Sequence, residues 1–565
     1  MSTRNLHVFS VVTRLALWLV LAAWGLLALI LGTIHLVIVP RIDDWRPRLE
    51  QWASATVGVP VRVGELRALR ASGASDFMPA LMPAFELQDV RLYDPQGRVA
   101  LQLPLVRTAL SLGSLWRLGF DQVVIDEPVL DVRRTEQGRI EVAGLDLSGT
   151  DTGDGAALDW FFAQTEFVIQ RGTVRWIDDW RAQAPLTLTA VDFVARNGAR
   201  KHQFQLQATP PTDWGDRFSL RAQLREPLLR LRQAQPEDLR WHNWSGALYA
   251  DFTRVDVVRL KSAVDLSEWG VSVQAGHGAL RAWADVADGR ITGLTADLAL
   301  RDVQAQLGPQ LPELALVSVD GRLSAQWDAS QRSLATEDLR FRTRDGKVWP
   351  GGLLRIAQTQ APGGRAVSAS LSAERVDLAA LAAIASSLPL GSATHGLIAE
   401  LAPVGRVENL QANWRGAAVA ASAGASEPPT LAGTWPDFGQ GEYQAKGRVL
   451  GLALASLPSG AVSATGGHVL PGRPGIEGAT VEFDLSQAGG RARLTVENGA
   501  LDLPGVFEES RLPLDRFEAD ATWRIDGERI EARLDKVRLA NADAEGTAQA
   551  SWHTSDPAGA AGGAA

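Results

Sequence analysis

The stretch Phe218–Arg225, F-S-L-R-A-Q-L-R, decides the fold because apolar and polar residues alternate in it almost without interruption. Successive side chains of a β-strand point to opposite faces of its sheet, so this stretch predicts a strand with one apolar face. The stretch His202–Thr209, H-Q-F-Q-L-Q-A-T, alternates in the same way. The pattern recurs along the chain, in the runs Leu294–Leu300, Val367–Ala373, Val481–Leu485, Ala492–Val496 and Phe517–Ile525.

Turn-forming residues separate these runs, as in Asp94-Pro95-Gln96-Gly97, Asp345-Gly346 and Asp526-Gly527. The sequence therefore predicts a mainly β protein with many one-sided strands in series. Such strands need a cover for their apolar face: a sandwich or closed barrel supplies protein, and an open groove takes a ligand. The alternation alone does not choose between these architectures.

The large apolar residues of these runs are the candidates for one continuous surface. Each run places its apolar side chains on a single face, and successive strands of a meander align like faces. The candidate surface consists of Phe204, Leu206, Phe218, Leu220, Leu224, Leu298, Leu300, Phe483, Leu485, Leu494, Val496, Phe517 and Trp523.

A membrane span is predicted at Leu15–Val39, which is 25 residues long and carries no formal charge. At 1.5 Å per residue, this length crosses a hydrocarbon core of roughly 30 Å. The run exceeds the apolar region of a signal peptide and ends in Ile38-Val39-Pro40-Arg41 without a small-residue cleavage site, which favours an uncleaved anchor. Arginines lie on both sides of the span, so charge does not set its orientation. The expected membrane contacts include Leu15, Trp18, Trp24, Leu29 and Val39.

Two short helices are expected outside the span. Asp43 or Asp44 can cap a helix that runs to about Thr56, and Asp377 can cap Leu378–Ser386. These features predict a tail (1–14), a span (15–39), a membrane-proximal helix and linker (40–64), a β region (65–556) and a low-complexity end (557–565).

Neither the composition nor the sequence motifs indicate a catalytic or metal-binding site. The net charge of −9 argues against nucleic-acid binding, and the absence of cysteine excludes disulfides, thiol catalysis and cysteine metal sites. The histidines are scattered singly, without metal-ligand spacing, and no phosphate-binding or nucleophile motif is present. Paired acids such as Asp126-Glu127 and Asp178-Asp179 are typical of solvated strand ends. We therefore expect no catalytic residue, no metal and no cofactor.

Several stretches resemble the AsmA-like superfamily, and most closely its large YhdP family. The resemblance lies in T-V-G-V-P-V-R-V at Thr56–Val63 and F-E-L-Q-D-V-R-L-Y-D at Phe85–Asp94. It continues in V-V-I-D-E-P-V-L-D-V-R-R-T-E-Q-G-R-I-E-V at Val123–Val142, where a Glu-Pro step and an Arg-Arg turn mark the strands. It extends through Phe167–Asp178 and Trp244–Phe252, and from about residue 260 onward it rests on the strand pattern alone.

The resemblance implies an inner-membrane anchor with a cytoplasmic N-terminus and an elongated periplasmic β-sheet curled into a hydrophobic groove. It implies contact with phospholipid acyl chains, movement of phospholipid toward the outer membrane, support of that membrane's permeability barrier, and partner proteins in either membrane. Chains of this family are usually longer, so a C-terminal truncation is also expected. An alternative function is an anchored assembly or scaffolding factor for outer-membrane proteins, in which the sheet packs against protein instead of lipid.

Overall fold

The computed structural model describes residues 14–554 apart from several segments. The longer gaps are 71–82, 94–96, 110–119, 147–159, 229–242, 264–271, 361–365, 418–440 and 458–471, and shorter gaps of one or two residues occur elsewhere. The expected tail and low-complexity end lie outside the described residues, except for Arg14.

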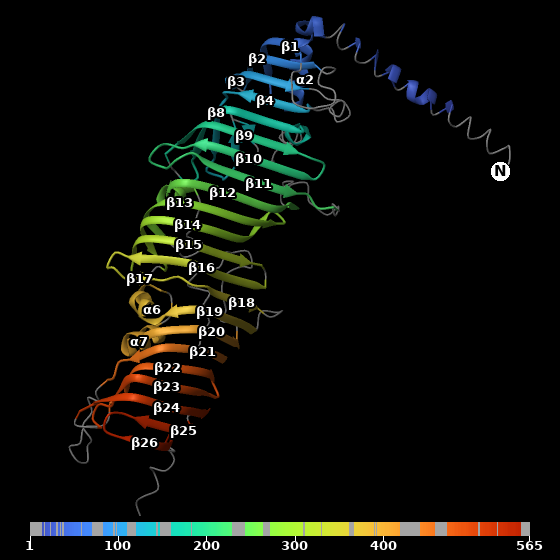
Figure 1. Ribbon diagram of the computed structural model, residues 1–565. Helices are drawn as coiled ribbons and strands as arrows, with labels where there is room; N and C mark the ends of the chain where they lie inside the picture. The colour runs from blue at the N-terminus through green and yellow to red at the C-terminus, as the bar shows by residue number, and fades with distance from the viewer. Residues whose placement is uncertain are drawn as a thin grey trace, which may run out of the picture. The chain divides into compact units, whose positions relative to one another are not determined.

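The chain divides into two compact units. The first contains Met1–Phe252 with Asp285–Ile291, and the second contains Thr253–Ala284 with Thr292–Ala565. Strands dominate both units, which confirms the mainly β prediction. In Figure 1 the labelled strands of each unit follow one another in chain order, apart from the short connecting strands.

The first unit is an open sheet of mostly antiparallel strands. Its strands are β1 (Val61–Arg70), β2 (Pro83–Tyr93), β3 (Val99–Ala109), β4 (Gln122–Asp126), β5 (Val129–Arg134), β6 (Ile140–Val142), β7 (Leu145–Asp146), β8 (Glu166–Asp178), β9 (Leu186–Asn197), β10 (Lys201–Thr209), β11 (Phe218–Arg225) and most of β12 (Ser245–Asp256). Strand β1 begins at Val61, ahead of the expected boundary at residue 65. Strands β4 and β5, separated by the Glu127-Pro128 step, both run parallel to β8.

The second unit is an antiparallel meander. It holds most of β13 (Ser272–Ala287) and β14 (Arg290–Gln306), then β15 (Leu314–Trp327), β16 (Gln331–Thr343), β17 (Val348–Trp349), β18 (Leu354–Gln360), β19 (Ala366–Asp377), β20 (Val404–Ala417), β21 (Glu442–Leu454), β22 (Gly475–Ser486), β23 (Gly489–Asp502), β24 (Arg511–Asp526), β25 (Arg529–Ala540) and β26 (Glu545–His553). From β18 to β26, each strand pairs with the next along the chain.

Both expected helices outside the span are present. Helix α2 (Arg46–Val57) follows a 3₁₀ segment, η2 (Val39–Trp45). Helix α6 (Leu378–Ile384) starts as predicted, because the side chain of Asp377 accepts a hydrogen bond from the Ala380 amide at 2.8 Å. The short 3₁₀ turn η5 (Ala385–Ser387) follows it.

Helix is not confined to the two segments that are expected outside the span. Helix α5 (Val257–Ala263) and helix α7 (Ser392–Leu401) are also present. Both are short, and α7 contains Gly396, a poor helix former, so their local sequence carried little helical signal. Packing against the neighbouring strands and helices outweighs that weak propensity.

The predicted span at Leu15–Val39 is described only in part. The described positions between Arg14 and Thr33 are helical, and the side chains of Leu15, Trp18, Trp24 and Leu29 are between 60% and 70% exposed. Val39 opens η2. Among the positions that the structure describes, no helix is both long and apolar enough to cross a membrane.

Candidate functional site: a creased apolar face

One continuous row of apolar residues crosses the first unit from strand to strand. Directly paired residues of neighbouring strands place their side chains on the same face of a sheet, so the strand pairings trace this row without a break. The row comprises Leu66, Leu87, Val106, Ile125, Ile169, Phe193, Leu206, Leu220 and Ala250. We call the face that carries this row the apolar face of the first unit.

The second unit has an apolar face of the same kind. Its row comprises Leu294, Ala325, Leu334, Ile356, Leu371, Ala412, Ala445, Leu485, Gly490, Trp523, Ala532 and Trp552. Alanine and glycine are interspersed among the larger residues of this row.

Residues with left-handed backbone angles interrupt the alternation in strands of both units. They have φ between +47° and +53° at Asp89, Arg171, Ala190, Asp302, Asp338, Asn409 and Lys536 and φ of +55° at Asn498. The pairing register shifts, as in a β-bulge, beside each of them except Asp89 and Asp302, where it continues unshifted. Asp and Asn tolerate this conformation better than most residues, and a bulge locally bends its strand. We call this line of positions the crease.

The crease keeps apolar side chains on one face even though the alternation shifts by one residue. Leu300 and Val303 flank Asp302, and Val407 and Leu410 flank Asn409. Leu300 and Val303 pack in one buried cluster, and Val407 and Leu410 pack in another. Side chains from both sides of the crease therefore belong to the same buried cluster and lie on the same face of the sheet.

All thirteen residues of the predicted surface lie on these apolar faces. The first unit carries Phe204, Leu206, Phe218, Leu220 and Leu224, and the second carries Leu298, Leu300, Phe483, Leu485, Leu494, Val496, Phe517 and Trp523. Only Leu300 and Val496 are buried, at 8% and 0% exposure, and the other eleven side chains are half-buried. A surface that runs through both units stays a prediction, as does any contact with lipid.

Helix α6 covers part of the apolar face in the second unit. Leu378 and Leu381 pack against the buried cluster that contains Val376 and Val407. The Lys347 ammonium group holds the end of the helix by donating a hydrogen bond to the Ala383 carbonyl at 3.0 Å. Figure 1 shows α6 beside β19. The cover is local, because residues farther along the row, such as Leu485 and Trp523, remain half-buried.

The first unit contains a cluster of aromatic side chains. The imidazole of His202 stacks on the indole of Trp244 with ring centroids 4.3 Å apart, and Phe162 meets both rings edge-on. His202 contacts Asn197 Oδ1 through Nδ1 at 3.0 Å and Glu226 Oε1 through Nε2 at 3.2 Å. Burial lowers the pKa of His202 below 6.5, and the Glu226 carboxylate opposes this shift. The sequence pattern assigns His202 no role, and nothing near it in the sequence indicates that Trp244 is its partner.

The opposite face of the sheet is polar and carries ion pairs. Cross-strand ion pairs join Arg322 to Asp297 at 2.6 Å and Arg493 to Asp520 at 2.9 Å. The hydrogen bond from Arg322 lowers the pKa of Asp297, and that from Arg493, followed by that from Lys536, lowers the pKa of Asp520. These carboxylates are therefore ionised at neutral pH, and this face is suited to water.

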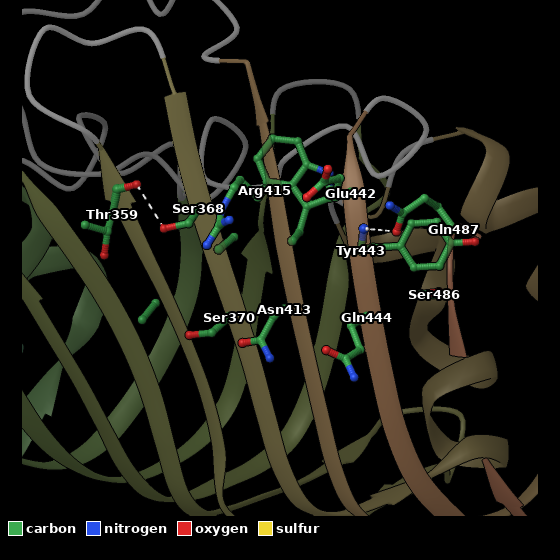
Figure 2. A pocket seen from close by; sticks show the side chains of 13 residues that line it. Thr359, Ser368, Ser370, Asn413, Arg415, Glu442, Tyr443, Gln444, Ser486 and Gln487 are labelled. Carbon is green, nitrogen blue, oxygen red and sulfur yellow. Dashed lines mark hydrogen bonds between the residues drawn. The ribbon is translucent and has the colours of Figure 1, made fainter. Parts of the chain in front are cut away.

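A hollow on the polar side of the second unit has a volume of about 660 Å³. Figure 2 shows Ser370, Asn413 and Gln444 side by side on neighbouring strands, with Ser486 on the next strand. Each of these residues is adjacent in the chain to a member of the apolar row. The lining offers hydrogen bonds, so this hollow suits a polar ligand and not an acyl chain. Nowhere in the described part of the chain do three or more His, Asp or Glu residues form a metal-binding group.

The comparisons with known proteins identify a family and no individual relative. A family model described as "YhdP protein" matches residues 1–561. No curated protein and no solved structure matches the chain. The match takes in the described strands of both apolar faces and confirms the resemblance found in the sequence. The chain belongs to the YhdP protein family.

Proposed function

We propose that this chain is an inner-membrane-anchored periplasmic lipid-transfer protein whose creased apolar faces hold the acyl chains of phospholipids. The observation that carries the proposal is that several large residues of the apolar rows stay partly accessible, while other members of the rows are buried. Residues such as Leu206, Leu220, Leu485 and Trp523 line up across successive strands, yet their side chains stay partly accessible. Membership of the YhdP family supports the same function.

The physical basis of transfer is a uniform apolar path. Each methylene group that leaves water contributes roughly 0.8 kcal/mol, so a long acyl chain gains substantial binding energy along the row. Positions that differ little in chemistry bind with similar affinity, and a lipid can therefore slide between them. The head group stays in water beside the open side of the crease. In this account no residue is catalytic, and the direction of transfer comes from outside the sheet.

The predicted span at Leu15–Val39 supplies the anchor, with the N-terminus in the cytoplasm and both units in the periplasm. This orientation follows the family resemblance, as does delivery toward the outer membrane in support of its permeability barrier. Reporter fusions placed after Asp44 test the topology. We expect them to be active only in the periplasm, and activity in the cytoplasm would refute this arrangement.

Site-specific photo-crosslinking in cells tests lipid contact. Crosslinkers at Leu206 and Leu485 are compared with crosslinkers at Gln205 and Asp484, their neighbours on the polar face. We expect phospholipid adducts at the two apolar positions and at neither polar position. Protein adducts at Leu206 and Leu485, without lipid, would support the scaffolding function instead and overturn the proposal.

A further inference from the structure

The outer edge of β1 is capped by helix α2. The Val61 amide donates to Ser54 Oγ at 2.8 Å, and the Val63 amide donates to Glu50 Oε1 at 2.8 Å. On the same edge, Arg46 Nη1 donates to the Gly64 carbonyl oxygen at 2.9 Å. An exposed strand edge presents unpaired backbone groups, and here side chains of α2 satisfy them. The helix is therefore fixed to the first strand of the apolar face.

The other side of this helical segment presents tryptophans to solvent. At about 100° per residue, Trp45, Arg48 and Trp52 fall on one stripe, nearly opposite the capping residues. The Trp45 and Trp52 side chains are 37% and 45% exposed, and the Arg48 guanidinium lies over the Trp45 ring at 4.9 Å. Trp52 also meets Phe120 edge-on at 6.2 Å, which fixes the orientation of the stripe relative to the sheet.

The position of the stripe in the chain indicates what covers it. Trp45 lies six residues after Val39, the end of the predicted span. The segment between them is η2, which is kinked at Arg41, so at about 2 Å per residue it covers at most roughly 12 Å. Tryptophan and arginine are favoured at the membrane–water interface, where an apolar ring and a polar group are both accommodated.

We propose that Trp45, Arg48 and Trp52 form a bilayer contact that lies in the headgroup layer of the membrane holding the predicted span. This inference rests on the anchor of the proposed function and adds a role for α2. Because the same helix caps β1, the contact holds the first strands of the apolar face against the bilayer surface. Phospholipid then enters the apolar face at β1, without crossing water.

Spin labels in the full chain, reconstituted in nanodiscs of phosphatidylethanolamine and phosphatidylglycerol, test the contact. The chain has no cysteine, so Trp45→Cys, Arg48→Cys and Trp52→Cys each give one labelled site, and Gln51→Cys is the matched control. We expect the ratio of oxygen accessibility to nickel-chelate accessibility to be several-fold higher at 45, 48 and 52 than at 51. Ratios equal to that of the control at all three positions overturn the inference.

A label at Leu29 separates this inference from the anchor. A buried label at 29 together with water-exposed labels at 45, 48 and 52 refutes the bilayer contact and leaves the anchor intact. A water-exposed label at 29 refutes both. In a loading assay, Trp45→Glu with Trp52→Glu should slow transfer from the nanodisc to the apolar face at least several-fold, whereas loading from lipid–detergent micelles should be unchanged. Equal slowing in both assays would mean that the double variant damages the apolar face itself, and would overturn the role in entry.

Discussion

Leu220→Asp places a charge in the middle of the apolar face of the first unit. Leu220 pairs with Leu206 on one side and Ala250 on the other, and its side chain is half-buried. Full burial of a leucine side chain contributes about 1.5–3 kcal/mol, so losing half of it costs about 1 kcal/mol of folding free energy. The carboxylate keeps its water on the open side. We therefore expect folded, abundant protein.

The same substitution should block lipid passage. A hydrated carboxylate excludes the acyl chain from a stretch of the face about one strand spacing wide, which is roughly 4.8 Å. We equate this length with about four methylenes of the acyl chain. At about 0.8 kcal/mol each, the lost burial amounts to about 3 kcal/mol, which slows passage on the order of 100-fold. The control is Gln223→Asp on the polar face of the same strand.

Photo-crosslinkers at Phe193 and Leu248, on either side of β11, measure the block. We expect Leu220→Asp to retain the lipid adduct at Phe193 and to lose it at Leu248, with both adducts kept in Gln223→Asp. If Leu220→Asp unfolds or is degraded, the face is a closed core, because burying an unpaired charge costs more free energy than the folding stability of the chain provides. If both adducts persist at the wild-type level, the sliding mechanism is refuted.

Three further predictions concern stability. Because burial lowers the pKa of His202, its cluster is most stable with the ring neutral, and this contribution is lost as pH falls through the lowered pKa. The protection factors of amides near Trp244, corrected for the intrinsic exchange rate at each pH, should be lower at pH 5 than at pH 7.5, and His202→Phe should abolish that difference. Asn409→Val forces a β-branched residue into φ of +53° and should cost about 1–3 kcal/mol in denaturant unfolding, whereas a loss of the same size in Asn409→Gly would contradict the role of the bulge. Asp377→Ala removes the α6 cap and should cost about 1 kcal/mol, seen as faster amide exchange in α6, and unchanged exchange would refute it.

The strands and their faces could be predicted because alternating side chains of a strand lie on opposite faces of its sheet. Each predicted apolar residue of Phe218–Arg225 lies on the apolar face, with no dependence on distant parts of the chain. Helix α6 could be predicted for a similar local reason, since its cap is Asp377. The span and the lipid contacts stay predictions.

The crease was missed although the sequence carries a signal for it. In L-Q-D-V at Leu87–Val90, L-R-D-V at Leu300–Val303 and V-E-N-L at Val407–Leu410, apolar residues stand three apart with Asp or Asn before the second. A strict alternation has even spacing, so this step of three marks a break in the alternation where the strand continues. The stacking of His202 on Trp244 had no such signal, because Trp244 immediately precedes β12, which is separated from the His202 strand β10 by β11.

Phospholipid bound to the purified full chain, quantified by mass spectrometry after extraction from mild detergent, tests the central claim most directly. The wild-type chain is compared with Leu206→Asp/Leu485→Asp, which charges both apolar faces, and with Gln205→Asp, which alters only the polar face. We predict at least one phospholipid per chain in the wild type and in Gln205→Asp, and several-fold less in the double variant. A wild-type chain free of phospholipid, or a folded double variant that carries as much as the wild type, would contradict the account.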